Sequence, residues 1–240
     1  MSVTEKYDSL KFRLMTVERL RMLKKLYSYR ELSRITGVPD TILCRYVKGA
    51  VIPSIDQAEK IWKALDKALD IKVVLRRNMN ITSDGYIDLS SIISDPLIIE
   101  YIAHKAYSVF AGKRVTKILT LHADSMVLAT ALAIKFQVPL LVVRTRKESA
   151  HSEYYEKVVY IPPSTSITYY IPKHMLRRKD EVIIVDTVIS SGKTLKALVD
   201  LVKEAKASVG GALALIAVGS EWRGEVQIPV EVFLEIPKHV

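Results

Sequence analysis

The stretch VIIVDTVISSGKT, residues 182–194, decides the fold of the larger part of this chain. Its apolar residues 182–185 predict a buried parallel strand, with Asp186 at the carboxyl end. The small residues 190–194 predict a turn, and a helix is expected over 195–205. A strand, a small-residue loop and a helix in this order place backbone N–H groups and hydroxyls at a helix N-terminus, where folds of this kind hold a phosphate.

Strands and helices alternate on both sides of this stretch. Strands are expected at 117–121, 138–143, 212–218 and 230–234, and helices at 95–110, 127–135 and 195–206. This alternation predicts an α/β fold in which helices flank a parallel, doubly wound sheet. In such sheets the ligand lies at the carboxyl ends of the strands.

The first third of the chain has a different pattern. Ser28 predicts the start of a helix over 29–35, with Glu31 as its capping-box partner and Gly37 at its end. After a short turn, a second helix is expected over 40–47. The result is a pair of short helices joined by a glycine turn.

A third helix, over 54–69, is expected to complete a small all-α core in which Leu32, Val38 and Leu43 are buried. We therefore place an N-terminal domain at 1–75 and a C-terminal domain at 76–240.

The stretch SYRELSRITGVPDTILCRYVKG, residues 28–49, resembles the helix-turn-helix of the Cro and phage-repressor type. In that family the second helix enters the major groove of DNA. The resemblance implies DNA contacts for Arg34, Asp40, Thr41, Cys44, Arg45 and Lys48. Arg45 is expected to contact a base or a phosphate, and Lys48 and Arg34 to contact phosphates. A helical packing or dimerisation module is the alternative interpretation.

The distribution of charge agrees with a polyanion partner for the first third. Residues 1–80 hold 17 Lys and Arg against 9 Asp and Glu, a balance of +8, whereas residues 81–240 hold 19 against 17, a balance of +2. The basic excess therefore belongs to the N-terminal third. An ordinary lysine-rich solvated surface would give the same count.

Residues 182–194 resemble the phosphoribosyl pyrophosphate signature of type I phosphoribosyltransferases. The resemblance implies that Asp186 and Thr187 contact the ribose hydroxyls. It also implies that the 5′-phosphate is bound by Ser190, Ser191, Gly192, Lys193 and Thr194. Thr187 departs from the family pattern, which has a second acid there. A hydroxyl can hydrogen-bond to ribose but carries no charge, so we expect binding to survive where catalysis does not.

The resemblance covers most of residues 80–240. The segment NITSDGYIDLSSIISDP, 80–96, is similar to the N-terminal part of orotate phosphoribosyltransferases, with Ser90 in place of an arginine. The run 164–175 is similar to the purine-repressor branch of the family, whose members kept the binding site and lost the reaction.

Two further segments imply contacts to an anion. In the family, the turn after the strand at 117–121 holds the pyrophosphate, which points to Ala123, Asp124 and Ser125. The polar stretch 144–157 corresponds to a mobile loop over the pyrophosphate. Its candidate anion contacts are Arg144, Arg146 and Lys147, and ordinary solvated loop charges are the alternative.

Several other sites are excluded by composition and spacing. SSGKT ends like a P-loop, but Thr187 stands where GxxxxGK[ST] requires the first glycine. Cys44 is the only cysteine, so an internal disulfide and a cysteine-based zinc site are excluded, and the five histidines show no ligand spacing. No cofactor is expected, and Mg²⁺ would arrive only with a phosphoribosyl pyrophosphate ligand.

The sequence shows no signal-like N-terminus and no run of about 18 apolar residues. It therefore predicts a cytoplasmic protein with no membrane partner.

A helix-turn-helix followed by a phosphoribosyltransferase-like domain resembles the archaeal GfcR-type transcriptional regulators over essentially the whole chain. The resemblance implies a homodimer that binds a double-stranded DNA operator. It also implies an effector, either phosphoribosyl pyrophosphate or a related phosphorylated ribose or nucleotide. The alternatives are an active orotate or purine phosphoribosyltransferase with an appended DNA-binding domain, which Ser90 and Thr187 disfavour, and a nucleotide-sensing scaffold that does not bind DNA.

Overall fold

A computed structural model describes residues 3–68, 70–149, 152–161 and 165–238. The chain divides into two compact units. The first contains Met1–Arg77 and Asp95–Tyr101, and the second contains Asn78–Ser94 and Ile102–Val240. Within the described residues, no helix has both the length and the apolar character that a membrane span requires.

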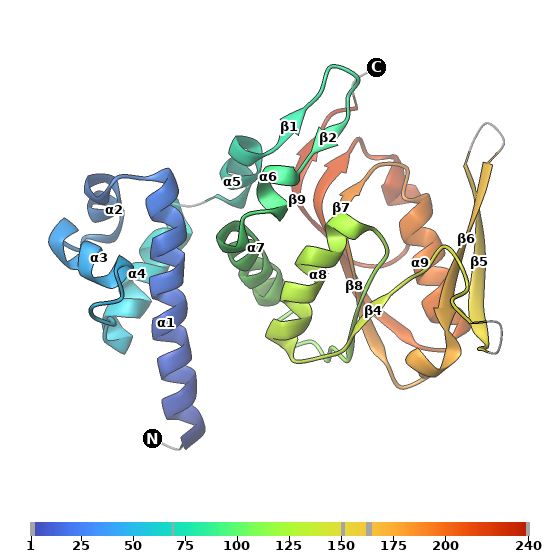
Figure 1. The fold of residues 1–240 in the computed structure, drawn as a ribbon, viewed down its shortest axis with the longest axis horizontal. Helices are drawn as coiled ribbons and strands as arrows, with labels where there is room; N and C mark the ends of the chain where they lie inside the picture. The colour runs from blue at the N-terminus through green and yellow to red at the C-terminus, as the bar shows by residue number, and fades with distance from the viewer. Residues whose placement is uncertain (1–2, 69, 150–151, 162–164, 239–240) are drawn as a thin grey trace. The chain divides into compact units, whose positions relative to one another are not determined.

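The first unit is helical (Figure 1). Its helices are α1 (Val3–Leu26), α2 (Tyr29–Thr36), α3 (Asp40–Val47), α4 (Ile55–Ala68) and α5 (Ile71–Asn78). The three helices expected from the sequence correspond to α2, α3 and α4. Helix α1 has no counterpart among the expectations, because Leu10 and Leu14 are exposed and its apolar pattern does not mark one continuous buried face.

The capping box at the start of α2 forms as the sequence predicts. Ser28 Oγ accepts a hydrogen bond from the Glu31 N–H at 3.3 Å, and Glu31 Oε2 accepts one from the Ser28 N–H at 2.7 Å. At the other end, Gly37 adopts a φ of 70° and donates its N–H to Ser33 O at 2.8 Å. Both ends of this helix are therefore set by local sequence.

Replacing the cap residue, Ser28→Ala, is expected to lower the stability of the first unit by about 1 kcal/mol, because the Glu31 N–H loses its acceptor, the Ser28 hydroxyl. Urea denaturation followed by far-UV circular dichroism measures the change. Lys60→Ala, at an exposed position inside α4, is the control and should shift the midpoint little. Equal shifts for the two variants would contradict the role of the cap.

The core of the first unit lies between α1, α2, α3 and α4. Leu32, Val38 and Leu43 are buried, as predicted, and they pack with residues of α1 and α4 such as Leu20 and Ile61. Truncating any one of these side chains would leave a cavity, which typically costs about 2–5 kcal/mol. This core holds α2 and α3 at a fixed crossing.

The second unit is built on a five-stranded parallel sheet. Its strand order is β4 (Leu140–Val142), β3 (Lys117–Thr120), β7 (Glu181–Ile189), β8 (Ser208–Val218) and β9 (Val230–Ile236). The predicted α/β fold with a parallel sheet flanked by helices is confirmed. From β3 the chain adds β4 on one side, and from β7 it adds β8 and β9 on the other side. The order in which strands are added therefore reverses between the neighbouring strands β3 and β7.

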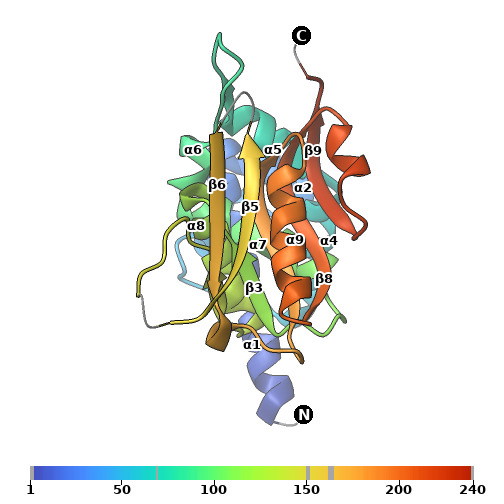
Figure 2. The same ribbon diagram turned by 90° about the vertical axis from the view of Figure 1, so that its right-hand side faces the viewer.

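Helices cover both faces of this sheet. Helix α8 (Ala123–Phe136) packs on β3, β4 and β7, and α9 (Lys193–Glu204) packs on β7 and β8. Figures 1 and 2 show α8 and α9 on opposite faces. The remaining elements are the β1–β2 hairpin (Asn80–Ile81 and Ile87–Asp88), α6 (Ser90–Ile93), α7 (Pro96–Val109), and the short 3₁₀ helices η1 (Lys173–Met175) and η2 (Glu221–Gly224).

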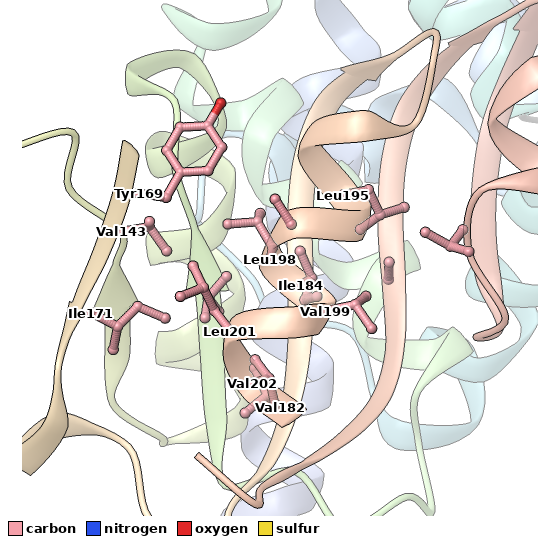
Figure 3. Packing of buried hydrophobic residues seen from close by; sticks show 14 of the residues in the cluster. Val143, Tyr169, Ile171, Val182, Ile184, Leu195, Leu198, Val199, Leu201 and Val202 are labelled. Carbon is pink, nitrogen blue, oxygen red and sulfur yellow. The ribbon is translucent and has the colours of Figure 1, made fainter. Parts of the chain in front are cut away.

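An antiparallel hairpin of β5 (Tyr154–Ile161) and β6 (Thr165–Pro172) lies beside α9 (Figure 2). The apolar side chains of α9, among them Leu198 and Leu201, gather with Tyr169 and Ile171 of β6 and with Ile184 of β7 (Figure 3). Burial of these side chains holds the hairpin and the sheet on opposite sides of one helix.

The structure corrects several boundaries, among them the start of β8, which lies at Ser208 and not at 212. Strand β7 continues to Ile189, so Asp186 and Thr187 lie within the strand and not at its end. Helix α9 begins at Lys193, inside the predicted turn. Residues 123–125 form the first turn of α8, where the sequence suggested a turn before a helix starting at 127. Finally, residues 154–157 of the expected loop belong to β5, because they pair with β6 in register. Residues 150–151 of that loop and residue 164 of the run 164–175 lie outside the described residues.

Candidate functional site

The candidate site of the second unit lies between β3 and β7, where the strand order of the sheet reverses. Strands β3 and β7 are parallel neighbours, so the segments that follow them emerge at the same edge. The first segment leads into the N-terminus of α8, and the second leads into the N-terminus of α9. The N-termini of both helices, with their unpaired N–H groups, thus lie at this edge, on opposite faces of the sheet (Figure 1).

Asp186 is the central acidic group of this edge. Its side chain is buried, with 7% of the residue exposed, and Oδ1 accepts the N–H of Thr187 at 2.8 Å. Burial raises the pKa of Asp186 to about 6, although the charge of His122 and the N–H groups of Thr187 and Val188 act in the opposite direction. The structure therefore holds a carboxyl group where desolvation disfavours its charge.

Thr187 lies next to Asp186 in β7 and is equally buried, at 6% exposure. It brings a hydroxyl, which can donate and accept one hydrogen bond but has no charge at neutral pH. Strand β7 therefore carries one carboxyl group and one hydroxyl at these two neighbouring positions.

The loop between β7 and α9 forms a small cradle. Ser190 and Ser191 are exposed, and Lys193 opens the helix with its side chain in solvent. Gly192 adopts a φ of 77° at the N-cap of α9, and the first turn of this helix contains no acidic residue. Hydroxyls, backbone N–H groups, a lysine and the positive end of a helix all favour an anion here.

Gly192 is also packed closely against Trp222 and Glu225. A Cβ at this position would lie 2.9 Å from Trp222 Cα and 3.2 Å from Glu225 Cβ. Lys196 Nζ of α9 forms an ion pair with Glu225 Oε2 at 2.9 Å, which fixes the segment after η2 against the helix. The loop can therefore take this shape only with glycine at 192.

The turn between β3 and α8 is tied to β7 by buried hydroxyls. Thr120 Oγ1 donates to Val185 O at 2.9 Å and lies 2.6 Å from Ser125 Oγ, which also bonds His122 O at 2.9 Å. Ala123 and Asp124 are exposed at the start of α8. These bonds place the turn beside Asp186, in agreement with the electrostatic effect of His122 on that carboxyl group.

The cations that follow β4 are mostly occupied by partners within the protein. Arg144 Nη1 pairs with Glu148 Oε1 at 3.0 Å, and its backbone bridges to Tyr170 of β6. Lys147 pairs with Glu156 and lies over the ring of Tyr170, 5.3 Å from its centroid. The hydrogen bond to Glu156 raises the pKa of Lys147 above its ordinary value.

Arg146 is exposed in the same segment. Its guanidinium forms no ion pair with any residue that the structure describes.

Two residues of the site were not assigned a contact from the sequence. His122 acts on Asp186 across the β3–β7 edge, which only the pairing of the two strands reveals. Trp222 is 4% exposed and stacks under Arg223, with the guanidinium 4.6 Å from its ring centroid. Its backbone and Cβ pack against Gly192, so it shapes the loop from the inside.

In the first unit, the residues expected to contact DNA lie largely in solvent. Arg34 on α2 and Asp40, Thr41, Arg45 and Lys48 at α3 are exposed, whereas Cys44 is half-buried. The Asp40 carboxylate accepts the N–H of Thr41 at 2.8 Å. Helix α3 buries Leu43 and Tyr46 toward the core, which directs Arg45 away from it.

The described residues provide few side chains that could bind a metal ion at this edge. The described residues contain no group of three His, Cys, Asp or Glu side chains that could hold a metal. Asp186 and the Thr187 hydroxyl would be the protein's oxygen donors to Mg²⁺ at this edge, and the other ligands would come from a bound phosphate compound and from water.

Comparison with known proteins matches this architecture. Residues 89–240 match the family model described as the phosphoribosyl transferase domain. A xanthine phosphoribosyltransferase of Heliobacterium modesticaldum is 31% identical over 119 residues, which are 49% of this chain and 63% of that protein. A second, of Finegoldia magna, is 30% identical over 124 residues. The chain thus matches less than two thirds of the length of these relatives.

A solved structure of adenine phosphoribosyltransferase from Rhodothermus marinus superposes with a TM-score of 0.64 and 19% identity, covering 69% of this chain and 98% of that chain. At that identity the likeness concerns the fold, and it agrees with the parallel sheet described above. More than half of the chain matches the family model, and the matched part contains both the β3–α8 and the β7–α9 turns. The chain therefore belongs to the phosphoribosyl transferase domain family.

Proposed function

We propose that this protein is a transcriptional regulator whose second unit binds a phosphorylated ribose or nucleotide and whose first unit binds DNA. The main support for the ligand site is the loop at residues 190–194, which lies at the N-terminus of α9 and follows the buried Asp186 in the chain. The DNA-binding half is supported by α2 and α3, by the exposed cations on them and by the basic excess of residues 1–80.

In this proposal each group at the sheet edge has a defined task. The exposed hydroxyls of Ser190 and Ser191, with Lys193 and the N–H groups of α9, bind the 5′-phosphate. Asp186 accepts hydrogen bonds from the ribose hydroxyls. Thr187 adds a further hydrogen bond. Because Thr187 lacks charge, the strand has no second carboxylate to stabilise positive charge that develops on a ribose carbon, so the site is suited to binding and poorly suited to group transfer.

Ligand binding is tested by isothermal titration calorimetry of the full chain against adenosine 5′-monophosphate and phosphoribosyl pyrophosphate. We expect binding of at least one compound, and a loss of more than about tenfold in affinity for both Asp186→Ala and Lys193→Ala. Lys203→Ala, at the opposite end of α9 and exposed, is the matched control. Unchanged affinity in the two site variants would contradict the assignment.

DNA binding is tested on the first unit with the variant Arg45→Ala. Arg45 is exposed on α3, and its loss removes a contact to a base or phosphate, so we expect operator affinity to fall about 5- to 100-fold. The measurement is a gel shift or fluorescence anisotropy titration with upstream DNA. Lys60→Ala, an exposed cation on α4, controls for the loss of one positive charge. Operator affinity equal to that of the unmodified protein would remove Arg45 from the interface.

A homodimer follows from this mode of DNA binding, because two recognition helices would meet half-sites one DNA turn apart. A ligand in the second unit would act by favouring one arrangement of the dimer. The ligand shifts the equilibrium only by its difference in affinity for the two arrangements.

The second candidate is an active purine phosphoribosyltransferase with an additional N-terminal unit. The comparisons favour it more directly, because the relatives of about 30% identity are named xanthine phosphoribosyltransferases. A turnover assay with phosphoribosyl pyrophosphate, Mg²⁺ and each of xanthine, adenine, guanine, hypoxanthine and orotate decides between the two. We expect no turnover by the unmodified protein. Clear turnover with any base would establish the enzyme, and Thr187→Asp tests whether the missing carboxylate limits the reaction.

A further inference from the structure

We propose that the site in the second unit prefers a ribose with a single 5′-phosphate, such as a nucleoside 5′-monophosphate or ribose 5-phosphate, over a ribose that also carries a diphosphate at C1. This inference rests on the proposed ligand-binding function and narrows it. It follows from an asymmetry between the two helix N-termini at the sheet edge.

The first turns of α9 and α8 have opposite electrostatic character. The first turn of α9 contains no acidic residue and begins with Lys193. The first turn of α8 contains Asp124, which is exposed. A carboxylate in the first turn already satisfies the positive end of the helix dipole, and it repels a second anion at the same place. A phosphate group is therefore favoured at α9 and disfavoured at α8.

The hydroxyls of the α8 turn are not available to a diphosphate. Ser125 and Thr120 are fully buried, their hydroxyl oxygens lie 2.6 Å apart, and their hydrogen-bond partners are the carbonyl oxygens of His122 and Val185. In the α9 loop, by contrast, Ser190 and Ser191 are exposed. The side-chain hydroxyls of the α8 turn thus join β3 to β7, and the exposed polar side chains of this turn are His122 and Asp124.

Two of the three candidate cations that could offset a diphosphate are also engaged, and the third, Arg146, is exposed. Arg144 is paired with Glu148, and Lys147 is paired with Glu156. Using either cation for a diphosphate would require breaking its surface ion pair. A divalent metal would have to enter with the diphosphate, and at these two positions β7 supplies one carboxylate, Asp186, and one hydroxyl, Thr187. The extra negative charge of a diphosphate therefore meets little compensation at this edge.

The test compares four compounds by calorimetry with the full chain: adenosine 5′-monophosphate, ribose 5-phosphate, phosphoribosyl pyrophosphate with Mg²⁺, and inorganic pyrophosphate with Mg²⁺. We expect at least one monophosphate to bind about 10-fold more tightly than phosphoribosyl pyrophosphate, and pyrophosphate not to bind. Trp222 lies against Gly192, so its fluorescence in a Trp62→Phe background gives an independent readout of loop occupancy.

The variant Asp124→Ser removes the carboxylate from α8. It is expected to raise the affinity for phosphoribosyl pyrophosphate about 5- to 10-fold and to leave that for the monophosphates unchanged. The matched control is Asp56→Ser, which removes an exposed carboxylate from the first turn of α4 in the other unit. This control should change neither affinity.

The outcomes separate this inference from the proposed function. If phosphoribosyl pyrophosphate binds as tightly as the monophosphates, or if Asp124→Ser fails to improve its binding, the preference for a single phosphate is wrong while the ligand site stands. If none of the four compounds binds the unmodified protein, the proposed ligand-binding function itself fails.

Discussion

Gly192→Ala is expected to destabilise the second unit by roughly 2–4 kcal/mol and to abolish binding of a phosphorylated ribose. The residue holds a φ of 77°, which costs an L-residue about 1–2 kcal/mol. The new Cβ would also lie 2.9 Å from Trp222 Cα, and overpacking of this kind typically costs about 1–3 kcal/mol. Because the contact is with backbone, the loop itself must move, and the phosphate loses its cradle.

Two other glycines separate these contributions. Gly85 has a φ of 81° and open space around its Cβ position, so Gly85→Ala carries the backbone cost alone. Gly224 has neither a positive φ nor a close neighbour, so Gly224→Ala should be nearly neutral. Urea denaturation followed by Trp222 fluorescence in the Trp62→Phe background measures all three. A Gly192→Ala variant no less stable than Gly85→Ala would contradict the close packing against Trp222.

Asp186→Asn is expected to stabilise the free protein at pH 8 by on the order of 2–3 kcal/mol while weakening ligand binding. Burial raises the pKa of Asp186 from its ordinary value of 3.8 to about 6. Below about pH 4 the group is protonated in both the folded and the unfolded chain, so its contribution to stability is fully present. As the pH rises to 6 the unfolded chain ionises first, and the contribution is lost through this range. A shift of this size corresponds to roughly 3 kcal/mol.

The expected signature is therefore a difference between variant and unmodified protein that is small near pH 4, grows up to about pH 6 and is constant above it. Denaturation curves at five or six pH values measure this difference. Glu204→Gln, at an exposed position at the end of α9, is the control and should show no such growth. A difference that does not change with pH would mean that burial does not control the ionisation of Asp186.

Asp186 and Gly192 differ from ordinary positions in two ways, in the ionisation of a side chain and in backbone conformation. Asp186 is held where its charge is disfavoured, and Gly192 is held in a conformation that other residues avoid. The buried charge of Asp186 weakens the free protein, whereas glycine adopts the conformation at 192 without the strain that another residue would carry. Stabilising Asp186→Asn and destabilising Gly192→Ala should thus both lose the ligand, for opposite energetic reasons.

Much of the fold could be predicted because its signals are local. The capping box of Ser28 and Glu31, the glycine at 37 and the buried apolar positions of α3 require only neighbours in sequence. The strand at 182–185 is apolar throughout, as expected for a strand covered on both faces. Helix α1 could not be predicted in this way, since its outer face mixes Leu10 and Leu14 with charged residues and its burial depends on α3 and α4.

The full length of strands that pair with a remote segment of the chain was also not predicted from the sequence. Residues 154–157 read as a polar loop because Glu156 and Lys157 carry charges, yet they form the start of β5 through hydrogen bonds to β6. The extension of β7 to Ile189 depends in the same way on pairing with β8. Backbone hydrogen bonds between strands satisfy these residues irrespective of side-chain polarity, so a sequence pattern underestimates the length of such strands.

The sequence by itself determined the α/β class, the alternation of the sheet's strands with helices, the glycine-containing loop at 190–194 and the substitution of a hydroxyl for a carboxylate at Thr187. Only the tertiary structure decided how these groups behave. It buried Asp186 and placed His122 beside it, engaged Lys147 with Glu156, and left Asp124 in the first turn of α8. The reason is physical: residue type sets which charges and hydrogen bonds are possible, whereas solvent exposure and the distance between charges, which fix their energies, arise only when remote strands and helices pack together.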